Sequence, residues 1–484
     1  MSEVELDGRS LTPESVAAVA RRGSGVRLSP TARRRVARSA AAAEAAARRR
    51  VVYGRNSGVG ANRDVTADPT GHGRRLLDSH TAGAGEPYPA EVGRAALVVR
   101  ANQLAAGGSG VSPAVVDALT AAARAGAVPV LHRGGGLGTG DLTALAELGQ
   151  ALSGGAPWRD RGAPVVRLRD SDVLPLLSSN AVTTAEAALA LLDLSELLTA
   201  AEAVGALSVV ALSGNTEAYD PRVHRARPHP GQAEAAARLR ALLAGAPLVP
   251  RRVQDPFGLR ALPQVHGPAW EAAHRLYDAL LIELNAAAEN PLVISGDVLH
   301  NGNWHAAPLA VALDSLRLAL FGPASLSAAR VTALLDPELS GAPAFLAQGP
   351  AGSSGAMTME YVSQGALSRL RQAAAPAVLG TVVLSQGVED HASFAPLAAE
   401  LTTGSVAPLR TVLAAELVCA VRAMRLREVT PESLAPAPVG RLYAAVAAAL
   451  PEGAGDRPLT PDLAAAERLL PRLAAGTIPA RRRP

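Results

Sequence analysis

The residues most able to do unusual chemistry lie in a glycine-rich stretch, "GGGLGTG", at residues 134–140. When a small residue, a β-hydroxy residue and a glycine share a tight turn, the glycine nitrogen can attack the carbonyl two residues earlier. Gly138, Thr139 and Gly140 have this order, and glycine reaches the backbone angles that such a turn needs. Loss of two waters would leave a conjugated five-membered ring with an exocyclic alkene, an electrophile that side chains do not provide.

Of two other interpretations of the stretch, a dinucleotide-binding loop fails on its sequence context and a plain turn stays open. A dinucleotide-binding fingerprint would need a surrounding βαβ unit and strand–helix alternation that continues beyond it, and the sequence shows no clear sign of either. A plain turn is the simplest interpretation, because glycine clusters often mark turns. The segment that follows, "DLTALAELGQAL" (141–152), predicts a helix directly after the stretch.

Composition limits the kind of protein and the cofactors. Of 484 residues 48% are hydrophobic but only 3% are aromatic, so Ala, Leu and Val must build the core, and Ala and Leu favour helices. The single cysteine, Cys419, excludes a disulfide framework within the chain and a cysteine-only metal cluster. The chain has no lysine, which excludes a pyridoxal phosphate (PLP) aldimine and a P-loop lysine. We therefore expect no PLP, no metal and no nucleotide.

Charge and targeting signals argue against a nucleic-acid or membrane partner. The formal net charge is +4, and arginine runs occur at 33–35, 48–50 and 481–483. These runs lie among Ala and Glu or at the end of the chain without aromatic neighbours, which is typical of solvated helix faces and a tail. The first residues lack a signal-peptide pattern, and we expect no apolar run long and uncharged enough to cross a membrane. The expected protein is soluble and cytoplasmic, with no nucleic-acid or membrane partner.

The elements that must position these residues are mostly helices. Residues 12–50 predict two helices, each opening with Ser or Thr followed by Pro, and residues 72–106 return to helix. From Thr183 onward apolar residues recur every three to four positions, and several segments are almost continuously apolar. Short extended pieces are expected at 165–169 and 290–299. The pattern predicts a mainly α protein with a long central helical bundle.

The stretch "GGGLGTGDLTALAELGQAL" resembles the signature of the aromatic amino acid lyases, the histidine and phenylalanine ammonia-lyase family. In that family Gly-Ser-Val-Gly-Ala-Ser-Gly-Asp-Leu contains the Ala-Ser-Gly that becomes a methylidene-imidazolone. From about residue 10 to about residue 420, further segments resemble motifs of the family in the same order. They are "YGRNSGVG" (53–60), "LLDSHTAGAGEPYP" (76–89), "RANQLAAGGSGV" (100–111), "LLSSNA" (176–181), "VQDPFGLRALPQVHG" (253–267), "ELNAAAENPLV" (283–293), "NGNWHAAP" (301–308) and "VEDHAS" (388–393).

The resemblance implies a fold and an assembly. The fold would be the mainly α, fumarase/aspartase-like fold of the ammonia-lyases, with residues 1–484 forming one protomer. Within it, residues 1–200 would be an N-terminal region carrying the active site, and residues 201–484 the helical bundle and C-terminal helical region. The family forms homotetramers in which loops from different chains complete each site, so the resemblance implies the same assembly here.

The resemblance also assigns roles to individual residues. Tyr53 would be the base that removes the β-proton, provided that neighbouring dipoles lower its pKa, and the ring would form from Gly138, Thr139 and Gly140. The substrate would be bound by His80, Gln254, Phe257, Arg260, Asn303 and Glu389. Among these, Arg260 would hold the carboxylate with paired hydrogen bonds, whereas His80 and Glu389 would face the ring or the amine.

Structural alternatives remain open for several of these side chains. Tyr53 could pack its ring in a loop, His80 could be a helix-end histidine bound to the backbone, and Glu389 could form a buried ion pair. Gln254 and Asn303 could be scaffolding amides. His305 and His391 are expected to orient their neighbours rather than to bind a metal.

Departures from the family pattern bear on activity. Thr139 replaces serine, so the alkene would carry a methyl group at the carbon that the amine attacks, which should slow the chemistry. Gly138 and Leu137 replace alanine and glycine, and Phe257 replaces a tyrosine. Ser178 and Val388 replace asparagine and glutamine.

The resemblance predicts a carbon–nitrogen (ammonia) lyase or aminomutase acting on an aromatic or imidazole α-amino acid such as histidine, tyrosine or phenylalanine. One alternative is a repurposed enzyme of the same fold that lacks the electrophile and works by acid–base chemistry. The other is a catalytically silent homologue that binds a small ligand, since fold alone does not determine function.

Overall fold

The protein is described by a computed structural model that covers residues 3–159, 162–163 and 165–477. The chain divides into two compact units, each built from separate stretches of sequence. Unit 1 comprises Met1–Leu192, Leu276–Asp314 and Pro376–Thr403, and unit 2 comprises Asp193–Arg275, Ser315–Ala375 and Gly404–Pro484. The division of the protomer at about residue 200 stays a prediction. The arginine run at 481–483 lies outside the described residues.

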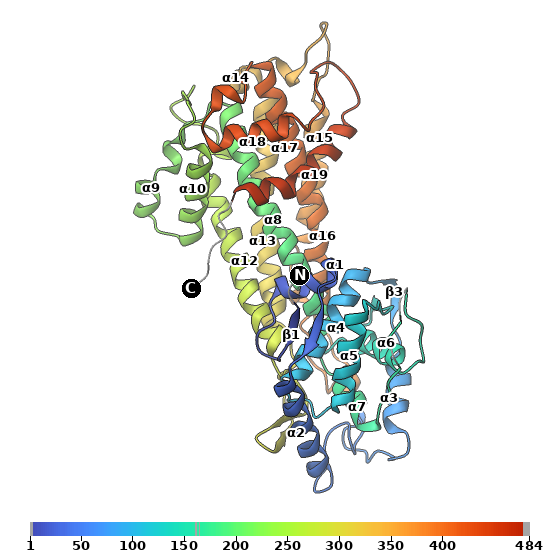
Figure 1. The fold of residues 1–484 in the computed structure, drawn as a ribbon. Coiled ribbons are helices and arrows are strands. Elements are labelled where there is room, and N and C mark those ends of the chain that lie inside the picture. Colours follow the sequence, from blue (N-terminus) through green and yellow to red (C-terminus); the bar gives the residue numbers. More distant parts are fainter. Residues whose placement is uncertain (1–2, 160–161, 164, 478–484) are drawn as a thin grey trace. The chain divides into compact units, whose positions relative to one another are not determined.

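Within its described residues, unit 1 contains the strands β1–β6 together with eight helices of 8 to 18 residues (Figure 1). Its helices are α1 (Pro13–Arg22), α2 (Pro30–Ala47), α3 (His72–His80), α4 (Ala90–Ala105), α5 (Pro113–Ala125), α6 (Leu142–Leu152), α7 (Asp170–Leu177) and, except for its last residue, α16 (Ala395–Gly404). Strand β1 (Val4–Leu6) pairs in parallel with β2 (Val26–Leu28), whereas β3 (Ala84–Pro87) pairs antiparallel with β4 (His132–Gly134) and β5 (Leu292–Ile294) with β6 (Asp297–Leu299).

Unit 2 is helical throughout its described elements. Its helices are α9 (Pro221–Ala226), α10 (Pro230–Leu243), α11 (Phe257–Arg260), α14 (Pro337–Ser340), α15 (Thr358–Ala373), α17 (Val406–Leu426), α18 (Pro438–Ala447) and α19 (Thr460–Thr477). Three long helices contribute residues to both units: α8 (Ala181–Ala211), α12 (Leu262–Asn285) and α13 (Ala307–Leu335). The mainly α architecture predicted from the sequence is confirmed.

Local signals explain where the first helices begin and end. The side chain of Thr12 accepts a hydrogen bond from the Ser15 amide at 3.2 Å, and Pro13 occupies the first helical position of α1. Gly23 then ends this helix in the left-handed conformation, with φ of +66°. The two helices expected within 12–50 are therefore confirmed as α1 and α2. The helix expected over 72–106 is instead divided into α3 and α4 by strand β3.

The two extended segments expected from the sequence have different outcomes. The segment 290–299 forms the β5–β6 hairpin, whose turn places Ser295 and Gly296 at positive φ. Residues 165–169 form no strand, so that expectation is wrong. A β-branched pattern needs a pairing partner to become a strand, and Val165 is instead 69% exposed.

The expectation about membrane-spanning segments is also wrong on length and composition. Among the described residues, three helical stretches are long and apolar enough to cross a membrane: Asp170–Ala211, Ala307–Leu335 and Ala395–Leu426. Their most apolar windows are 89%, 56% and 72% buried inside the protein. Helices that pack against protein on most sides acquire this all-round apolar character, which explains the composition.

The core of unit 1 is organised around α4. Its residues from Ala95 to Ala105 are buried, and α1 and α5 both pack on it. The same helix carries Arg100, Asn102 and Gln103, which are buried polar residues and therefore need partners. These side chains connect the core to the segments that form a cavity in this unit.

Candidate active site

A cavity of about 300 Å³ in unit 1 brings together residues from distant parts of the chain. Of the residues predicted from the sequence, Tyr53, His80, Thr139, Gly140 and Glu389 line it. Its other lining residues are Val59, Gly60, Asn62, Leu142, Leu174, Ser178, Ser179, Asn290, Trp304 and Ser385. A second cavity of about 470 Å³ shares four of these residues and adds the polar side chains of Arg63, Asp64, His300 and Asn301. The five-residue cluster is the structure's strongest candidate for a reaction site.

The glycine-rich stretch adopts backbone angles that favour glycine. Gly135, Gly138 and Gly140 have φ of +117°, +84° and +106°. A Cβ added at position 138 would lie 2.0 Å from Ser393 Oγ, so alanine would not fit there without movement. Glycine at 138 is thus required both by its φ and by the close approach of Ser393.

Both sides of the stretch are held in place by hydrogen bonds. The amide of Phe394 donates to the Leu137 carbonyl at 2.9 Å, and Ser393 Oγ donates to the Gly138 carbonyl at 3.2 Å. On the other side, the buried carboxyl of Asp141 accepts hydrogen bonds from the Thr183 amide and hydroxyl at 2.8 and 2.7 Å. Burial raises the pKa of Asp141 to about 6, and these hydrogen bonds oppose that shift. The loop around Thr139 is therefore held in place rather than free.

Tyr53 is half-buried, and its hydroxyl accepts a hydrogen bond from the Gly60 amide at 2.8 Å. Burial raises the pKa of the Tyr53 phenol above its ordinary value. The Gly60 hydrogen bond lowers it, the charge of Glu389 raises it, and Arg63 lowers it, so that the net pKa shift is upward. The pKa of Tyr53 is therefore raised rather than lowered, although the Gly60 hydrogen bond acts in the direction that catalysis by a phenolate needs.

His80 ends α3 and combines the two alternatives drawn from the sequence. Its Nδ1 lies 2.9 Å from the Leu76 carbonyl, which can only accept, so that Nδ1 carries the proton. The backbone therefore satisfies one ring nitrogen, as expected of a helix-end histidine. The ring also lines the cavity, and Nε2 is the atom through which it can act on a ligand.

Glu389 is positioned by a strained turn that contacts the Tyr53 loop. Leu384 and Glu389 are bridged by a 2.8 Å backbone hydrogen bond, and Ser385 and Gln386 between them have φ of +50° and +56°. Left-handed residues other than glycine cost on the order of 1 kcal/mol each and need support from their surroundings. Ser385 Oγ supplies it by accepting the Ala61 amide hydrogen bond at 2.8 Å.

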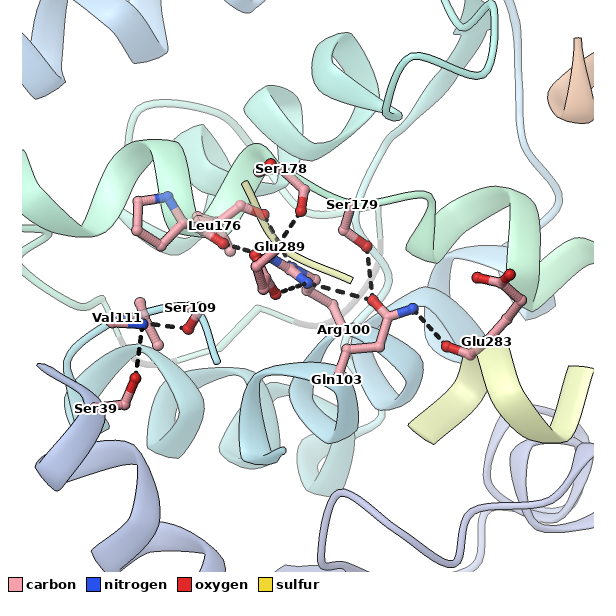
Figure 2. A network of polar contacts seen from close by, with 12 residues as sticks. Ser39, Arg100, Gln103, Ser109, Val111, Leu176, Ser178, Ser179, Glu283 and Glu289 are labelled. Atoms are coloured by element: carbon pink, nitrogen blue, oxygen red, sulfur yellow. Dashed lines mark hydrogen bonds and ion pairs between the residues drawn. The ribbon is translucent and has the colours of Figure 1, made fainter. Parts of the chain in front are cut away.

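A buried polar network fixes another wall of the cavity (Figure 2). Arg100 forms an ion pair with Glu289 at 3.0 Å, and both side chains are almost fully buried. Arg100 also donates to the Pro175 and Leu176 carbonyls at the end of α7. Since Glu289 precedes Asn290 and α7 leads directly to Ser178, the pair holds two segments that line the cavity. Removing one partner of such a buried pair would leave an uncompensated charge.

Gln103 extends this network to the neighbouring residue of the wall. Its carbonyl oxygen accepts a hydrogen bond from Ser179 Oγ at 2.6 Å, and its amide donates to the Glu283 carbonyl at 3.0 Å (Figure 2). Ser179, which follows the Ser178 that replaces the family's asparagine, is therefore anchored by α4.

Asn303 and the two histidines have other surroundings. Asn303 is exposed, and its backbone N–H donates to Asn301 Oδ1 at 2.7 Å. The adjacent Trp304 lines the cavity. His305 Nε2 lies 3.0 Å from His391 Nδ1, and burial followed by the charge of His391 lowers the pKa of His305. Across the described ranges, no cluster of three or more His, Cys, Asp or Glu residues is arranged to hold a metal.

Gln254, Phe257 and Arg260 belong to unit 2, near the single-turn helix α11. The guanidinium of Arg260 lies 4.1 Å from the centre of the Phe257 ring, and its Nε donates to the Asp255 carbonyl at 2.9 Å. These two contacts fix the plane of the guanidinium, a group whose paired nitrogens suit a carboxylate. Phe257 is 63% exposed, and Gln254 is exposed as well.

The segment that carries Arg260 rests on a buried charge network of unit 2. Arg330 donates to the Gly258 carbonyl at 2.9 Å and pairs with Glu416 through two contacts of 2.6 and 2.8 Å. Ser208 donates to the same carboxylate at 2.6 Å. Helices α8, α13 and α17 thus jointly support α11, which gives the partly buried Arg260 a rigid base.

Sequence reasoning missed several residues of the site. Asn62, Asn290 and Trp304 line the cavity, and Ser393 contacts the glycine stretch. Each lies in or beside a segment that resembles a family motif, which was the available signal. Residue type and spacing do not distinguish the side chain that points into a cavity from the one beside it.

Comparisons with known proteins show which family and which structures this chain resembles. A sequence model described as aromatic amino acid lyase matches residues 11–449. The histidine ammonia-lyase of Symbiobacterium thermophilum is 38% identical over 494 residues, covering 97% of this chain and 97% of that protein. The structure of the ergothioneine-degrading enzyme ergothionase from Treponema denticola has a TM-score of 0.90 and 26% identity, covering 98% and 99% of the two chains. Tyrosine aminomutase from Streptomyces globisporus has a TM-score of 0.89 and 27% identity, covering 98% and 97%.

Proposed function

The chain belongs to the aromatic amino acid lyase family and acts as an ammonia-lyase or aminomutase on aromatic or imidazole α-amino acids, and we infer that the unit 1 cavity is its reaction site. The observation that carries this inference is the convergence of Tyr53, His80, Thr139 and Glu389 on one cavity. These four side chains supply the base, the polar contacts and the ring precursor that elimination or migration of an amine requires.

The family uses a methylidene-imidazolone group, and the residues at 138–140 fit its formation. Thr139 has the β-hydroxyl and α-hydrogen that must leave, and the turn around it has positive φ at Gly138 and Gly140. The Gly138 carbonyl, which the Gly140 nitrogen must attack, already accepts a hydrogen bond from Ser393. When formed, the group supplies an electrophile that draws electrons from the substrate amine. The methyl group retained from threonine would crowd its reactive carbon.

The chain's own side chains would perform the remaining tasks. Tyr53 would remove the β-proton, helped by the Gly60 hydrogen bond to its oxygen. His80 Nε2 and the Glu389 carboxylate would contact the ring or amine of the substrate from other sides of the same cavity. Asn303 is exposed and directly precedes Trp304, which lines the cavity. Its side chain would therefore contact the substrate from the edge of the cavity.

Arg260 would hold the substrate carboxylate, with Gln254 and Phe257 beside it. Paired hydrogen bonds from a guanidinium suit a carboxylate, and stacking on Phe257 orients the plane of Arg260. These residues belong to unit 2, whereas Tyr53 belongs to unit 1. As the family resemblance implies, we propose a homotetramer in which loops of several protomers complete each site. We expect the assembled protein to be soluble and cytoplasmic.

The test of the function is a substrate screen with the purified full-length protein. Histidine, tyrosine and phenylalanine are incubated separately, and ammonia is measured together with the α,β-unsaturated acid and the β-amino acid by chromatography. Release of ammonia with the unsaturated acid supports a lyase, and formation of the β-amino acid supports an aminomutase. Failure to consume any aromatic or imidazole amino acid would contradict the proposed reaction.

Arg260→Lys is expected to raise KM by about 30-fold, because lysine cannot make the paired hydrogen bonds and cannot stack on Phe257 as a planar group. The measurement is steady-state kinetics with the amino acid that the wild-type protein consumes. Arg222→Lys is the matched control, since Arg222 is an exposed arginine of the same unit that pairs with Asp220. An unchanged KM in Arg260→Lys would remove Arg260 from the substrate site.

Glu389→Gln is expected to move the rising limb of the pH profile of kcat/KM to lower pH. The charge of Glu389 raises the pKa of Tyr53, so its removal lowers that pKa and yields the phenolate base at lower pH. Arg63→Gln is the opposite control, because Arg63 lowers the same pKa and its loss should shift the limb upward. Identical limbs in both variants and the wild type would exclude Tyr53 as the titrating base.

A further inference from the structure

Ser393 has a position that its part in the VEDHAS segment does not explain. It is only 3% exposed, and its hydroxyl lies between the glycine stretch and the start of α16. Oγ donates to the Gly138 carbonyl at 3.2 Å and accepts the Ala395 amide at 3.3 Å. The accepted hydrogen bond fixes the direction of the hydroxyl, so that its proton points at the Gly138 oxygen.

The contact depends on glycine at position 138. A Cβ there would lie 2.0 Å from Ser393 Oγ and 3.0 Å from the Phe394 nitrogen. The missing methyl group of Gly138, one of this chain's departures from the family pattern, therefore leaves the space that the serine hydroxyl occupies. The neighbouring Phe394 amide holds Leu137 at 2.9 Å, so the segment 393–394 binds two successive carbonyls of the stretch.

The Gly138 carbonyl is the group that must be attacked when the ring forms. In that step the Gly140 nitrogen forms a bond to the Gly138 carbonyl carbon, and the electron pair of the C=O bond moves to the Gly138 oxygen. Negative charge develops on this oxygen before it gains the proton that the nitrogen loses. A buried donor already aimed at the oxygen stabilises the developing charge without reorganisation.

We propose that Ser393 is a catalytic residue for formation of the ring from Gly138, Thr139 and Gly140, acting as the hydrogen-bond donor to the Gly138 oxygen. The proposal rests on the electrophile assigned above. After the attack, the new hydroxyl on the Gly138 carbon leaves as water with the Thr139 amide proton and forms a C=N bond. The Thr139 hydroxyl leaves as the second water with the Thr139 α-proton. Both losses are dehydrations and need no oxidant.

The test follows ring formation by mass rather than by activity. The full-length wild type and the Ser393→Ala variant are expressed in parallel. At intervals after synthesis, the mass of the peptide containing residues 138–140 is measured by mass spectrometry. In the wild type this peptide becomes lighter by the mass of two waters. In Ser393→Ala the same loss is expected to be about 100-fold slower, the effect typical of removing one oxyanion donor. Thr120→Ala, which removes a buried hydroxyl from α5 of the same unit, should mature like the wild type.

A second variant guards against loss of folding, because Ser393→Ala also removes the contact to the Ala395 amide. Ser393→Cys keeps a small side chain in the same space but offers only a weak donor. It should retain the wild-type thermal transition and still mature more slowly. Maturation of either folded variant at the wild-type rate would overturn the role of Ser393 alone. A wild-type peptide that keeps its full sequence mass would overturn both the role of Ser393 and the formation of the electrophile.

Discussion

Tyr53→Phe is expected to reduce kcat for amine release by about 10³-fold while binding of the amino acid persists. The hydroxyl is the only group lost, and a positioned general base contributes typically about 10²–10⁴-fold to proton abstraction. Phenylalanine keeps the ring that packs in the cavity but also loses the oxygen that accepts the Gly60 hydrogen bond. Kinetics give the rate, and calorimetric titration with the amino acid that the wild type consumes gives the binding.

Tyr277→Phe is the matched control for this substitution. Tyr277 also belongs to unit 1, and its hydroxyl donates to Glu14 Oε2 at 3.1 Å, outside the residues that line the two cavities. It should leave kcat unchanged. If Tyr53→Phe retained the wild-type kcat, another group would have to be the base, and the interpretation of Tyr53 as a packed loop tyrosine would be correct.

Thr139→Ala is expected to abolish amine release, with a loss of more than about 10⁴-fold, because alanine has no β-hydroxyl to leave as water. The peptide that contains Gly138–Gly140 should then lack the alkene-forming water loss. Thr139→Ser is the matched variant, since serine keeps the hydroxyl and removes the methyl group from the reactive carbon. It should form the ring and turn over faster than the wild type, because attack on the unsubstituted carbon is less hindered.

These two substitutions of Thr139 separate the alternatives drawn from the sequence. A repurposed enzyme that works by acid–base chemistry would tolerate Thr139→Ala but would still depend on Tyr53 or Glu389. Retention of activity in Thr139→Ala would therefore favour that alternative and contradict the role of the backbone electrophile.

Much of the helical architecture could be predicted because its signals are local. Thr12, Pro13 and Gly23 mark the ends of α1 within a few residues, and the apolar period identifies the long helices wherever they pack. The segment 165–169 shows the limit of this reasoning, because a strand depends on a partner elsewhere in the chain. The apolar helices were misjudged as too short or too charged to span a membrane, since burial inside the protein imposes the same composition.

The site could be predicted in part through its resemblance to a family, and the reason is again physical. Motif spacing located Tyr53, His80, Thr139 and Glu389, which the structure places around one cavity. The raised pKa of Tyr53 could not be inferred, because it depends on burial and on Glu389, which lies far away in sequence. The contact between Ser393 and Gly138 likewise depends on two segments that meet only in the folded chain.

The measurement that tests the account most directly is the mass of the peptide containing Gly138, Thr139 and Gly140 from the purified wild-type protein. The account predicts a peptide lighter than its sequence by two waters, with the loss confined to these three residues by fragmentation. A peptide with the full sequence mass in freshly purified, folded protein would contradict it, because no electrophile would then be present to activate the amine.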